Sequence, residues 1–387
     1  MPDGAEPVTA TLLGAIDEVS AEAWDACAGA QNPFVSHAFL SALERSGSAV
    51  PDQGWQPRHL VVPDRDGGLL GAAPLYLKSH SYGEYVFDWG WADAYERAGG
   101  SYYPKLQACV PFTPVTGPRL LVRPGAEAEA VSATLIAGLT EVARRHQVSS
   151  LHVTFCEQAE WRQLGDAGFL RRTGRQFHWH NRGYDSFDAF LDGLTSRKRK
   201  MIRKERRKVA ESGITLRALR GEAIEPRHWD AFHRFYLATA DRKWGSPYLT
   251  RDFFHRLGET LTERVVLVVA EDRGEMIAAA LNLLGEDALY GRNWGALGDY
   301  RFLHFEACYY QAIEFAIEHG LARVEAGAQG EHKIQRGYMP VETYSAHWIA
   351  DPGFREAVEN YLAHERRGIA GEIAGLATFG PFRQDRD

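Results

Sequence analysis

An internal repeat constrains the fold of this chain more than any other feature. The stretch LVVPDRDGGLLGAAPLYL, residues 60–77, aligns without a gap to LVVAEDRGEMIAAALNLL, residues 267–284, and seven of the eighteen positions are identical. Background residue frequencies predict about one identity, so a chance likeness between two generic strands is the weaker explanation. Further matches follow in the same order along the chain: residues 24–26 with 229–231, 32–43 with 246–257, and 168–179 with 337–348. These matches indicate that the chain is a tandem duplication of one unit.

Each copy predicts the same order of elements: two helices, a hairpin, a strand, a helix and two further strands. The second helix starts near Asn32-Pro33 or Ser246-Pro247, where proline suits a first turn. Apolar runs around Asp-Arg-Asp-Gly and Glu-Asp-Arg-Gly predict the hairpins. The expected strands lie at 60–62, 69–77, 265–269, 276–284, 288–294, 322–326 and 343–349, and a helix is expected over 302–319. This order predicts an α/β (α+β) fold of two domains, residues 1–183 and 184–387, each a mixed, mainly antiparallel sheet flanked by helices.

Composition narrows the class of protein. A chain of 387 residues with 45% apolar residues and a net charge of −7 can bury two cores, and its acidic balance argues against coating of nucleic acid. Its four cysteines are widely spaced, which predicts neither a disulfide framework nor a structural zinc site. The chain shows no signal-peptide pattern and no apolar run of about 18 residues. We therefore expect a cytoplasmic protein without a membrane span.

One short segment is strongly basic. Nine of the twelve residues 197–208 are Lys or Arg and only Glu205 is acidic, so the segment carries +8 and the remainder carries −7 − 8 = −15. Thr195-Ser196 and Gly213 predict the ends of one helix, 197–212, at the junction of the two repeats. Ile202 and Val209 share one side of this helix, and most of the cations fan over the other side.

The basic helix has two functional interpretations and one without a function in binding. Arg199 and Arg206 flank the apolar edge, and together with Arg203 they could turn their planar guanidinium groups inward toward a phosphate. The exposed cations could instead meet tRNA phosphates, with an affinity that falls steeply with salt. The remaining alternative is a solvated charged face.

Several segments carry a family resemblance. The order of elements resembles the GNAT acyltransferase fold, and two such units in one chain resemble the Fem peptidoglycan-branching aminoacyltransferases. Nearly the whole chain is similar to the FemAB-like group of N-acyltransferases, in the segments FDWGWADAY, PFTPVTGPRLL, YGRNWG, FLHFEACYYQAIEFA and EAGAQGEHKIQRGY. The resemblance implies transfer of an acyl or aminoacyl group to an amine without a metal. It also implies acyl-CoA or aminoacyl-tRNA as the donor.

The GNAT resemblance directs attention to residues 292–297. GNAT enzymes hold pyrophosphate with an R/Q-x-x-G-x-G/A loop before a helix, and this chain has Arg292-Asn-Trp294-Gly295-Ala-Leu297. A leucine replaces the last small residue, and Asp299 follows closely, so acetyl-CoA binding in the standard manner is not expected. The first copy has no match to the motif, which predicts the donor site in the second copy. Gly295 and Gly298 could also be plain turn glycines.

Two candidate groups follow in the second copy. Glu306 falls within the apolar arc of its helix, so burial would raise its pKa and suit it to act as a general base. Pairing with Arg292 or Lys333 is the structural alternative. On the same helix, His304 and Tyr309 are candidate substrate-binding residues, and His304 could instead cap the helix.

A polar, glycine-flanked turn after the expected strand 322–326 gives the remaining candidates of the second copy. His332 could move a proton, and Lys333 or Arg336 could stabilise an oxyanion. Gln329 and Glu331 add an amide and an acid to the expected pocket rim. The chain shows no metal-ligand spacing and no nucleotide-binding fingerprint.

Aromatic residues concentrate in residues 82–103 of the first copy. Much of this stretch is expected to be core, but such stretches also form walls for sugar rings or peptides. The candidate wall comprises Trp89 and Tyr103, with Asp88 and Lys105 as polar anchors. The sequence thus predicts a metal-independent N-acyltransferase with an anionic small-molecule or glycopeptide substrate. A non-catalytic tandem module that binds an anionic glycopeptide or RNA is the alternative.

Overall fold

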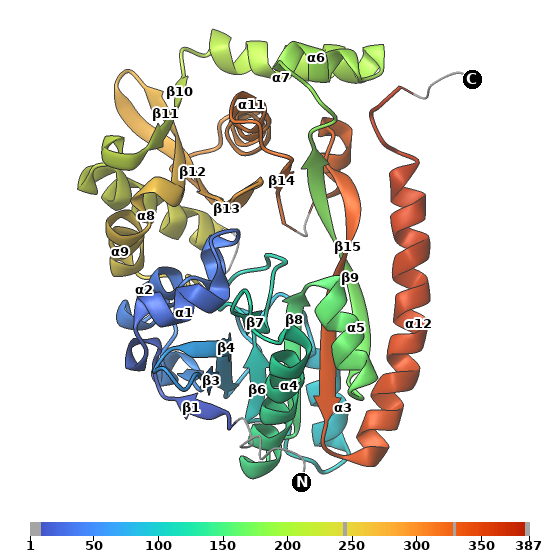
Figure 1. The fold of residues 1–387 in the computed structure, drawn as a ribbon. Helices are drawn as coiled ribbons and strands as arrows, with labels where there is room; N and C mark the ends of the chain where they lie inside the picture. The colour runs from blue at the N-terminus through green and yellow to red at the C-terminus, as the bar shows by residue number, and fades with distance from the viewer. Residues whose placement is uncertain (1–8, 243–245, 328–329, 384–387) are drawn as a thin grey trace. The chain divides into compact units, whose positions relative to one another are not determined.

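The computed structural model describes residues 9–242, 246–327 and 330–383, and the chain divides into two compact units (Figure 1). Unit 1 comprises Met1–Gly174 and Thr343–Gly368, and unit 2 comprises Arg175–Glu342 and Ile369–Asp387. The last strand of the first repeat, β9 (Leu170–His180), begins in unit 1 and ends in unit 2, whereas β15 (Met339–Ile349) runs from unit 2 into unit 1. The two repeats therefore exchange their final strands, so no single boundary near residue 183 separates them.

Unit 1 contains two groups of paired strands. An antiparallel sheet has the order β1-β3-β4-β7, and a second group runs β2-β5-β6-β8-β15, antiparallel except for the parallel pair β6–β8. Helix α4 (Ala128–Arg145) packs on β3, β4, β7 and β8 and closes an aliphatic core. The bounds are β1 Thr11–Leu13, β2 Trp55–Pro57, β3 His59–Pro63, β4 Leu69–Ala73, β5 Leu75–Lys78, β6 Lys105–Ala108, β7 Leu121–Val122 and β8 Ser150–Cys156.

Unit 2 contains one run of strands in the order β10-β11-β12-β13-β14-β9, in which β13 and β14 are parallel and the other neighbours antiparallel. The expected fold class is confirmed, because each unit is a mixed, mainly antiparallel sheet flanked by helices. Figure 1 shows α11 (Gln311–Glu318) against this sheet, where its apolar side chains join those of β9, β13 and β14 in one core. The bounds are β10 Thr215–Arg220, β11 Val265–Asp272, β12 Glu275–Leu284, β13 Ala288–Ala296 and β14 Arg323–Glu325.

The aligned hairpins differ at one position. The expected strand 69–77 is divided at Pro74, which has no N–H for a ladder bond, so β4 pairs with β3 and β5 pairs with β2 and β6. Leu281 occupies the aligned place in unit 2, and β12 runs through it unbroken. A bulge between Leu281 and Asn282 shifts the register there, so that Leu281 lies opposite Asn293 whereas Asn282 lies opposite Gly291.

The helices that the sequence predicts lie in the expected places, but their bounds and internal geometry differ from the prediction. The basic helix α7 spans Ser196–Glu211, and the expected helix 302–319 is present as α10 (Leu303–Phe305), η6 (Glu306–Tyr310) and α11. The middle piece η6 is a π-helical turn, which changes the spacing of all later side chains. The remaining helices include α1 Ala21–Ala28, α2 His37–Arg45, α3 Trp89–Arg97, α5 Gln158–Asp166, α6 Phe187–Asp192, α8 Pro226–Arg242, α9 Arg251–Thr260 and α12 Pro352–Ala377.

The repeat preserves a helix cap. Ser36 accepts the Phe39 N–H at the start of α2, and the aligned Thr250 accepts the Phe253 N–H at the start of α9, at 3.3 and 3.1 Å. Each helix therefore begins after this hydroxyl residue rather than at the preceding proline, because the cap satisfies an N–H that has no partner within the helix.

Loss of this cap in unit 2 has a measurable consequence. We expect Thr250→Ala to lower the free energy of unfolding of unit 2 by about 1 kcal/mol, because the Phe253 N–H loses its acceptor. Urea denaturation followed by tryptophan fluorescence measures the change. Thr250→Ser keeps the hydroxyl and should unfold at nearly the wild-type midpoint. Equal losses in both variants would show that the methyl group, not the cap, supplies the stability.

Candidate active site

The parallel strands β13 and β14 separate to form a cavity in unit 2. They pair only through residues 288–290 and 323–325, after which β13 continues along β12 to Ala296 while β14 ends. A cavity of about 90 Å³ lies where the two strands part. Its lining comes from β12, β13, the α10–η6 segment and the residue after β14: Ala280, Leu281, Asn282, Gly291, Arg292, Asn293, Trp294, His304, Cys308, Tyr309 and Ala326. Sequence reasoning singled out four of these: Arg292, Trp294, His304 and Tyr309.

A tyrosine and a histidine are hydrogen-bonded at the cavity. The Tyr309 hydroxyl lies 3.0 Å from His332 Nε2, and the ring of His304 packs edge-on against both Tyr309 and Trp294. Burial raises the pKa of Tyr309, so its phenol stays protonated at neutral pH. Burial and the positive charges of Arg336 and Lys333 lower the pKa of His332, so its imidazole is neutral there. The pair can therefore hold and pass on a proton at the cavity wall.

Two cations of η7 (Glu331–Arg336) hold the segment around His332. Lys333 is 4% exposed, and its ammonium donates to the carbonyl oxygens of Ala326 and Gly327; burial lowers its pKa to about 8. Arg336 donates to both carboxylate oxygens of Glu205 at 2.8 and 2.9 Å and to the His332 carbonyl at 2.8 Å. These contacts use the donors that were expected to stabilise an oxyanion. Glu331 is exposed, and Gln329 lies outside the described residues.

Glu306 is buried as expected, but its partners differ from those considered. Its carboxylate accepts from Arg206 Nε at 3.1 Å and from the Gln311 amide at 2.9 Å, and it does not line the cavity. The π turn is the physical reason, because the angles that placed Glu306 among apolar residues assumed regular α-helical spacing. These contacts match the structural alternative of an ion pair, but the partner is Arg206 rather than Arg292 or Lys333.

Residues 292–297 do not form a phosphate-binding loop. Arg292 to Ala296 belong to β13, and a Cβ on Gly295 would lie 2.5 Å from the backbone of Phe235 in α8. Gly295 is therefore a strand glycine that allows close packing of a helix, neither a pyrophosphate contact nor a turn. Any phosphate of a donor must find its partners elsewhere in unit 2.

The arginines of α7 divide between structural pairs and solvent. Arg199 pairs with Asp192 at 2.8 Å and Arg203 with Asp188 at 3.1 Å, so each guanidinium already has a carboxylate partner. Arg206 is taken by Glu306 and Glu314. Within the described parts of the chain, the exposed side chains of Arg197, Lys200 and Lys204 make no ion pair.

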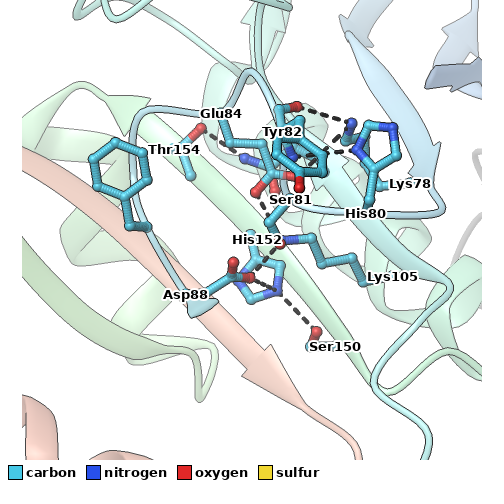
Figure 2. A network of polar contacts seen from close by, with 12 residues as sticks. Lys78, His80, Ser81, Tyr82, Glu84, Asp88, Lys105, Ser150, His152 and Thr154 are labelled. Atoms are coloured by element: carbon cyan, nitrogen blue, oxygen red, sulfur yellow. Dashed lines mark hydrogen bonds and ion pairs between the residues drawn. The ribbon is translucent and has the colours of Figure 1, made fainter. Parts of the chain in front are cut away.

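In unit 1, the candidate polar anchors form a buried network (Figure 2). The Lys105 ammonium donates to Asp88, to Glu84 at 2.7 Å and to Ser81 at 2.7 Å. Burial raises the pKa of Glu84 to about 7. Burial also acts to raise the pKa of Asp88, but the Lys105 charge together with hydrogen bonds from Lys105, Ser81 and Tyr102 holds that pKa below its ordinary value. Trp89 remains 40% exposed, but Asp88 and Lys105 are 3% and 0% exposed, so they fix the loop rather than face a ligand.

The place in unit 1 that corresponds to the unit 2 cavity is filled. The strand β6 ends at Ala108, whereas β8 continues to Cys156. Residues 115–119 lie along the part of the β8 edge that is no longer paired with β6. Gly117 donates its N–H to the Phe155 carbonyl, and Arg119, 1% exposed, donates to the carbonyls of Thr154 and Val115. A guanidinium thus occupies the gap that unit 2 keeps open.

Sequence reasoning missed Glu325, the last residue of β14. It is 3% exposed, and burial raises its pKa to about 7. The alternation of polar and apolar residues in Gln176-Phe-His178-Trp-His180 and in Arg323-Val-Glu325 was the available signal, because it indicates strands with one polar and one apolar face. Among the described residues there is no cluster of three potential metal ligands and no helix long and apolar enough to cross a membrane.

Known proteins are similar to this chain in sequence family and in fold. A profile of the FemAB-like family, described as peptidoglycan biosynthesis/recognition, matches residues 15–384, whereas no curated protein matches the chain. FemX has a similar structure, with a TM-score of 0.55 at 12% identity over 88% of this chain and 98% of FemX. The C-terminal DUF2156 domain of a putative lysylphosphatidylglycerol synthetase from Agrobacterium fabrum gives 0.55 at 11% identity, over 89% and 95%. L-PGS from Bacillus licheniformis gives 0.52 at 11%, over 83% and 95%. At these identities the likeness to solved structures concerns the fold.

The buried network of unit 1 makes a prediction about stability. Lys105→Met leaves Glu84 and Asp88 as uncompensated buried carboxylates, so we expect a loss of about 3–5 kcal/mol in the free energy of unfolding at neutral pH. The loss should shrink as the pH falls, because Lys105 stabilises Asp88 only while that carboxyl is ionised. Arg97→Met, which breaks an exposed pair with Asp93, is the control, with an expected loss below about 1 kcal/mol. Equal losses in the two variants would contradict a structural role for the network.

Proposed function

This chain belongs to the FemAB-like family of peptidoglycan biosynthesis and recognition proteins, and we propose that its unit 2 transfers an acyl or aminoacyl group from an activated donor to an amine. The parting of β13 and β14 carries the proposal, because it opens a cavity beside the hydrogen-bonded Tyr309 and His332. An apolar cavity of about 150 Å³ holds benzene, so one of about 90 Å³ fits roughly three or four non-hydrogen atoms. An acetyl or glycyl group has that size.

Tyr309 is suited to protonate the leaving atom of the donor. When an amine attacks the donor carbonyl, the thiol sulfur or the alcohol oxygen of the carrier leaves, and this atom must gain a proton. With its own proton on Nε2, the neutral His332 donates to the Tyr309 oxygen and leaves the phenolic hydrogen free to point at the leaving atom. The contact of Arg336 with the His332 carbonyl holds this imidazole in place.

The donor phosphates are assigned to α7. The helix packs on η6 and η7, which carry Tyr309 and His332, and it supplies exposed cations for an anion. Arg197, Lys200 and Lys204 recur at three- and four-residue steps and so line one face. Acyl-CoA and aminoacyl-tRNA both carry the required phosphates. The family description favours an amine of a peptidoglycan precursor as the acceptor.

A transfer assay tests the proposal directly. Purified protein is incubated with acetyl-CoA or with glycyl-tRNA, together with a peptidoglycan-precursor peptide bearing a free amine, and mass spectrometry detects the amide. We expect Tyr309→Phe to lower kcat at least about 100-fold, because the leaving atom loses its proton donor. Tyr184→Phe removes a phenolic oxygen outside the cavity lining and should keep wild-type turnover.

Two other results would redirect the proposal. Wild-type turnover in the Tyr309→Phe variant would remove this hydroxyl from the chemistry. Tight binding of a glycopeptide or RNA with no transfer from either donor would favour the alternative of a non-catalytic binding module.

The charge of α7 distinguishes the two donors. If aminoacyl-tRNA is the donor, changing Lys200 and Lys204 to Ala should weaken tRNA binding and reduce the slope of log K against log salt by roughly one to two, because each lost phosphate contact removes about 0.7–0.9. Binding is measured by filter retention across a salt series. Arg144 and Arg145 are exposed cations of unit 1, and their double alanine variant is the control. Equal slopes in both double variants would exclude α7 as the phosphate contact.

A further inference from the structure

The unit 2 sheet has one apolar and one polar face at the point where its strands part. Trp179, Val324 and Leu289 stand next to one another in β9, β14 and β13 and belong to the core that includes α11. Because side chains alternate along a strand, their neighbours His178, Glu325 and Tyr290 project together from the opposite face. A row of buried polar side chains is the informative departure from an ordinary sheet.

Glu325 has one engaged and one unengaged carboxylate oxygen. Its Oε1 accepts from Arg323 Nε at 2.9 Å, whereas its Oε2 has no hydrogen-bond partner although the residue is 3% exposed. His178 Nε2 is 3.6 Å from Oε2, beyond hydrogen-bonding distance, and it contacts the Gln176 amide oxygen at 3.1 Å. A buried acceptor without a donor is costly, and at Glu325 it lies at the end of β14, beside the gap, where a ligand can supply the donor.

The surroundings of Glu325 hold the pKa of its carboxyl near neutrality, so the carboxylate and the carboxylic acid are both populated there. Burial raises its pKa to about 7, Arg323 opposes that shift, and Asp287 adds to it. Burial, with the nearby charges of His180, Arg323 and Lys333, lowers the pKa of His178 to about 3, so the histidine is neutral and cannot neutralise the carboxylate. Tyr290 stays a phenol, because burial raises its pKa.

The position of Glu325 relates it to the cavity. It is the last residue of β14 that pairs with β13, and the next residue, Ala326, lines the cavity. The backbone carbonyl of Glu325 lies 3.3 Å from the place a Cβ on Gly291 would occupy, so only glycine leaves the opening between the strands unobstructed there. The carboxylate and the cavity thus lie on opposite faces of the sheet at the same gap.

We propose that Glu325 accepts the proton of the acceptor ammonium, which approaches the gap on the polar face while the donor acyl group occupies the cavity on the other face. The inference rests on the proposed function of unit 2. An ammonium supplies the hydrogen-bond donor that Oε2 lacks, and only a neutral amine can attack a carbonyl carbon. The substrate class is therefore a primary amine, protonated in solution.

The step balances in atoms and charge. One N–H proton passes from the ammonium to the Glu325 carboxylate, directly or through one water molecule, and leaves a neutral amine and a carboxylic acid. The amine nitrogen forms a bond to the donor carbonyl carbon, and the carbon–sulfur or carbon–oxygen bond to the carrier breaks. As the Tyr309 proton reaches the carrier atom, the second N–H proton passes to water, and a proton from water restores the Tyr309 phenol. The carboxylic acid finally returns its proton to water.

The first test is the pH dependence of transfer in matched variants. In the wild type, kcat/KM should rise with pH through about 7 and then flatten, since the carboxylate is the active form. Glu325→Gln should lower kcat at least about 100-fold and lose this rise, with little change in the KM for the donor. Asp287→Asn removes the other carboxylate bound to Arg323 and should keep the rate at high pH and the rise, with the rise displaced toward lower pH because Asp287 adds to the pKa shift of Glu325. An unchanged rate and pH profile in Glu325→Gln would overturn the inference while leaving the proposed function intact.

A second measurement does not depend on turnover. In protein labelled with carbon-13 at the glutamate carboxyl, the Glu325 signal is identified by its loss in the folded Glu325→Gln variant. The signal should titrate near pH 7, and glycinamide should move the midpoint down, because a bound ammonium favours the carboxylate. A midpoint near the ordinary value of 4.5, or one that ignores glycinamide, would overturn the inference. The expected titration together with no transfer from any donor would instead defeat the proposed function and leave an amine-binding site.

Discussion

The early end of pairing between β13 and β14 is the constraint on which the candidate site depends. Two parallel strands that stay in register leave no room between them, but here the pairing lasts for three residues and β13 then follows β12 alone. The bulge beside Asn282 and the π turn of η6 occur at the same level of the sheet, and they turn Arg292 and Tyr309 toward the gap. The cavity, the tyrosine–histidine pair and the place of the buried Glu325 at the gap all follow from this one interruption.

Buried charges determine the geometry around that interruption. Glu205 is the only acidic residue within the basic stretch 197–208, and it shares the buried side of α7 with Ile202 and Val209, where it forms a two-point contact with Arg336. The pair ties α7 to the short helix that carries His332. Such a pair adds little net stability compared with apolar packing, yet removal of one partner leaves a buried charge, so it restricts the arrangement strongly. In unit 1, Lys105 has the same effect on the loop that carries Glu84 and Asp88.

The two repeats differ at the place where their parallel strand pairs end. Both have a parallel strand pair that ends after three residues, between β6 and β8 in unit 1 and between β13 and β14 in unit 2. In unit 1 the opening is filled by residues 115–119, and the Arg119 guanidinium satisfies carbonyls that would otherwise lie open. In unit 2 the corresponding space remains a cavity, lined by large side chains such as Trp294 and Tyr309 together with Ala280, Gly291 and Ala326. Duplication of a fold therefore does not duplicate every detail of its geometry.

The sequence by itself determined the repeat, the fold class, the hairpins and the basic helix, because periodicity, turn residues and caps act between near neighbours in the chain. It singled out Arg292, Trp294, His304 and Tyr309 as separate candidates but not their meeting at one cavity. It did not determine the strand exchange, the π turn that moved Glu306 into an ion pair with Arg206, or the importance of Glu325. Only the tertiary structure decided these features. Glu205 and Arg336 are 131 residues apart, and Arg206 and Glu306 are 100 apart. A side chain's burial and its partner depend on such distant segments, and a carboxylate becomes a base or a structural anion only when both are known.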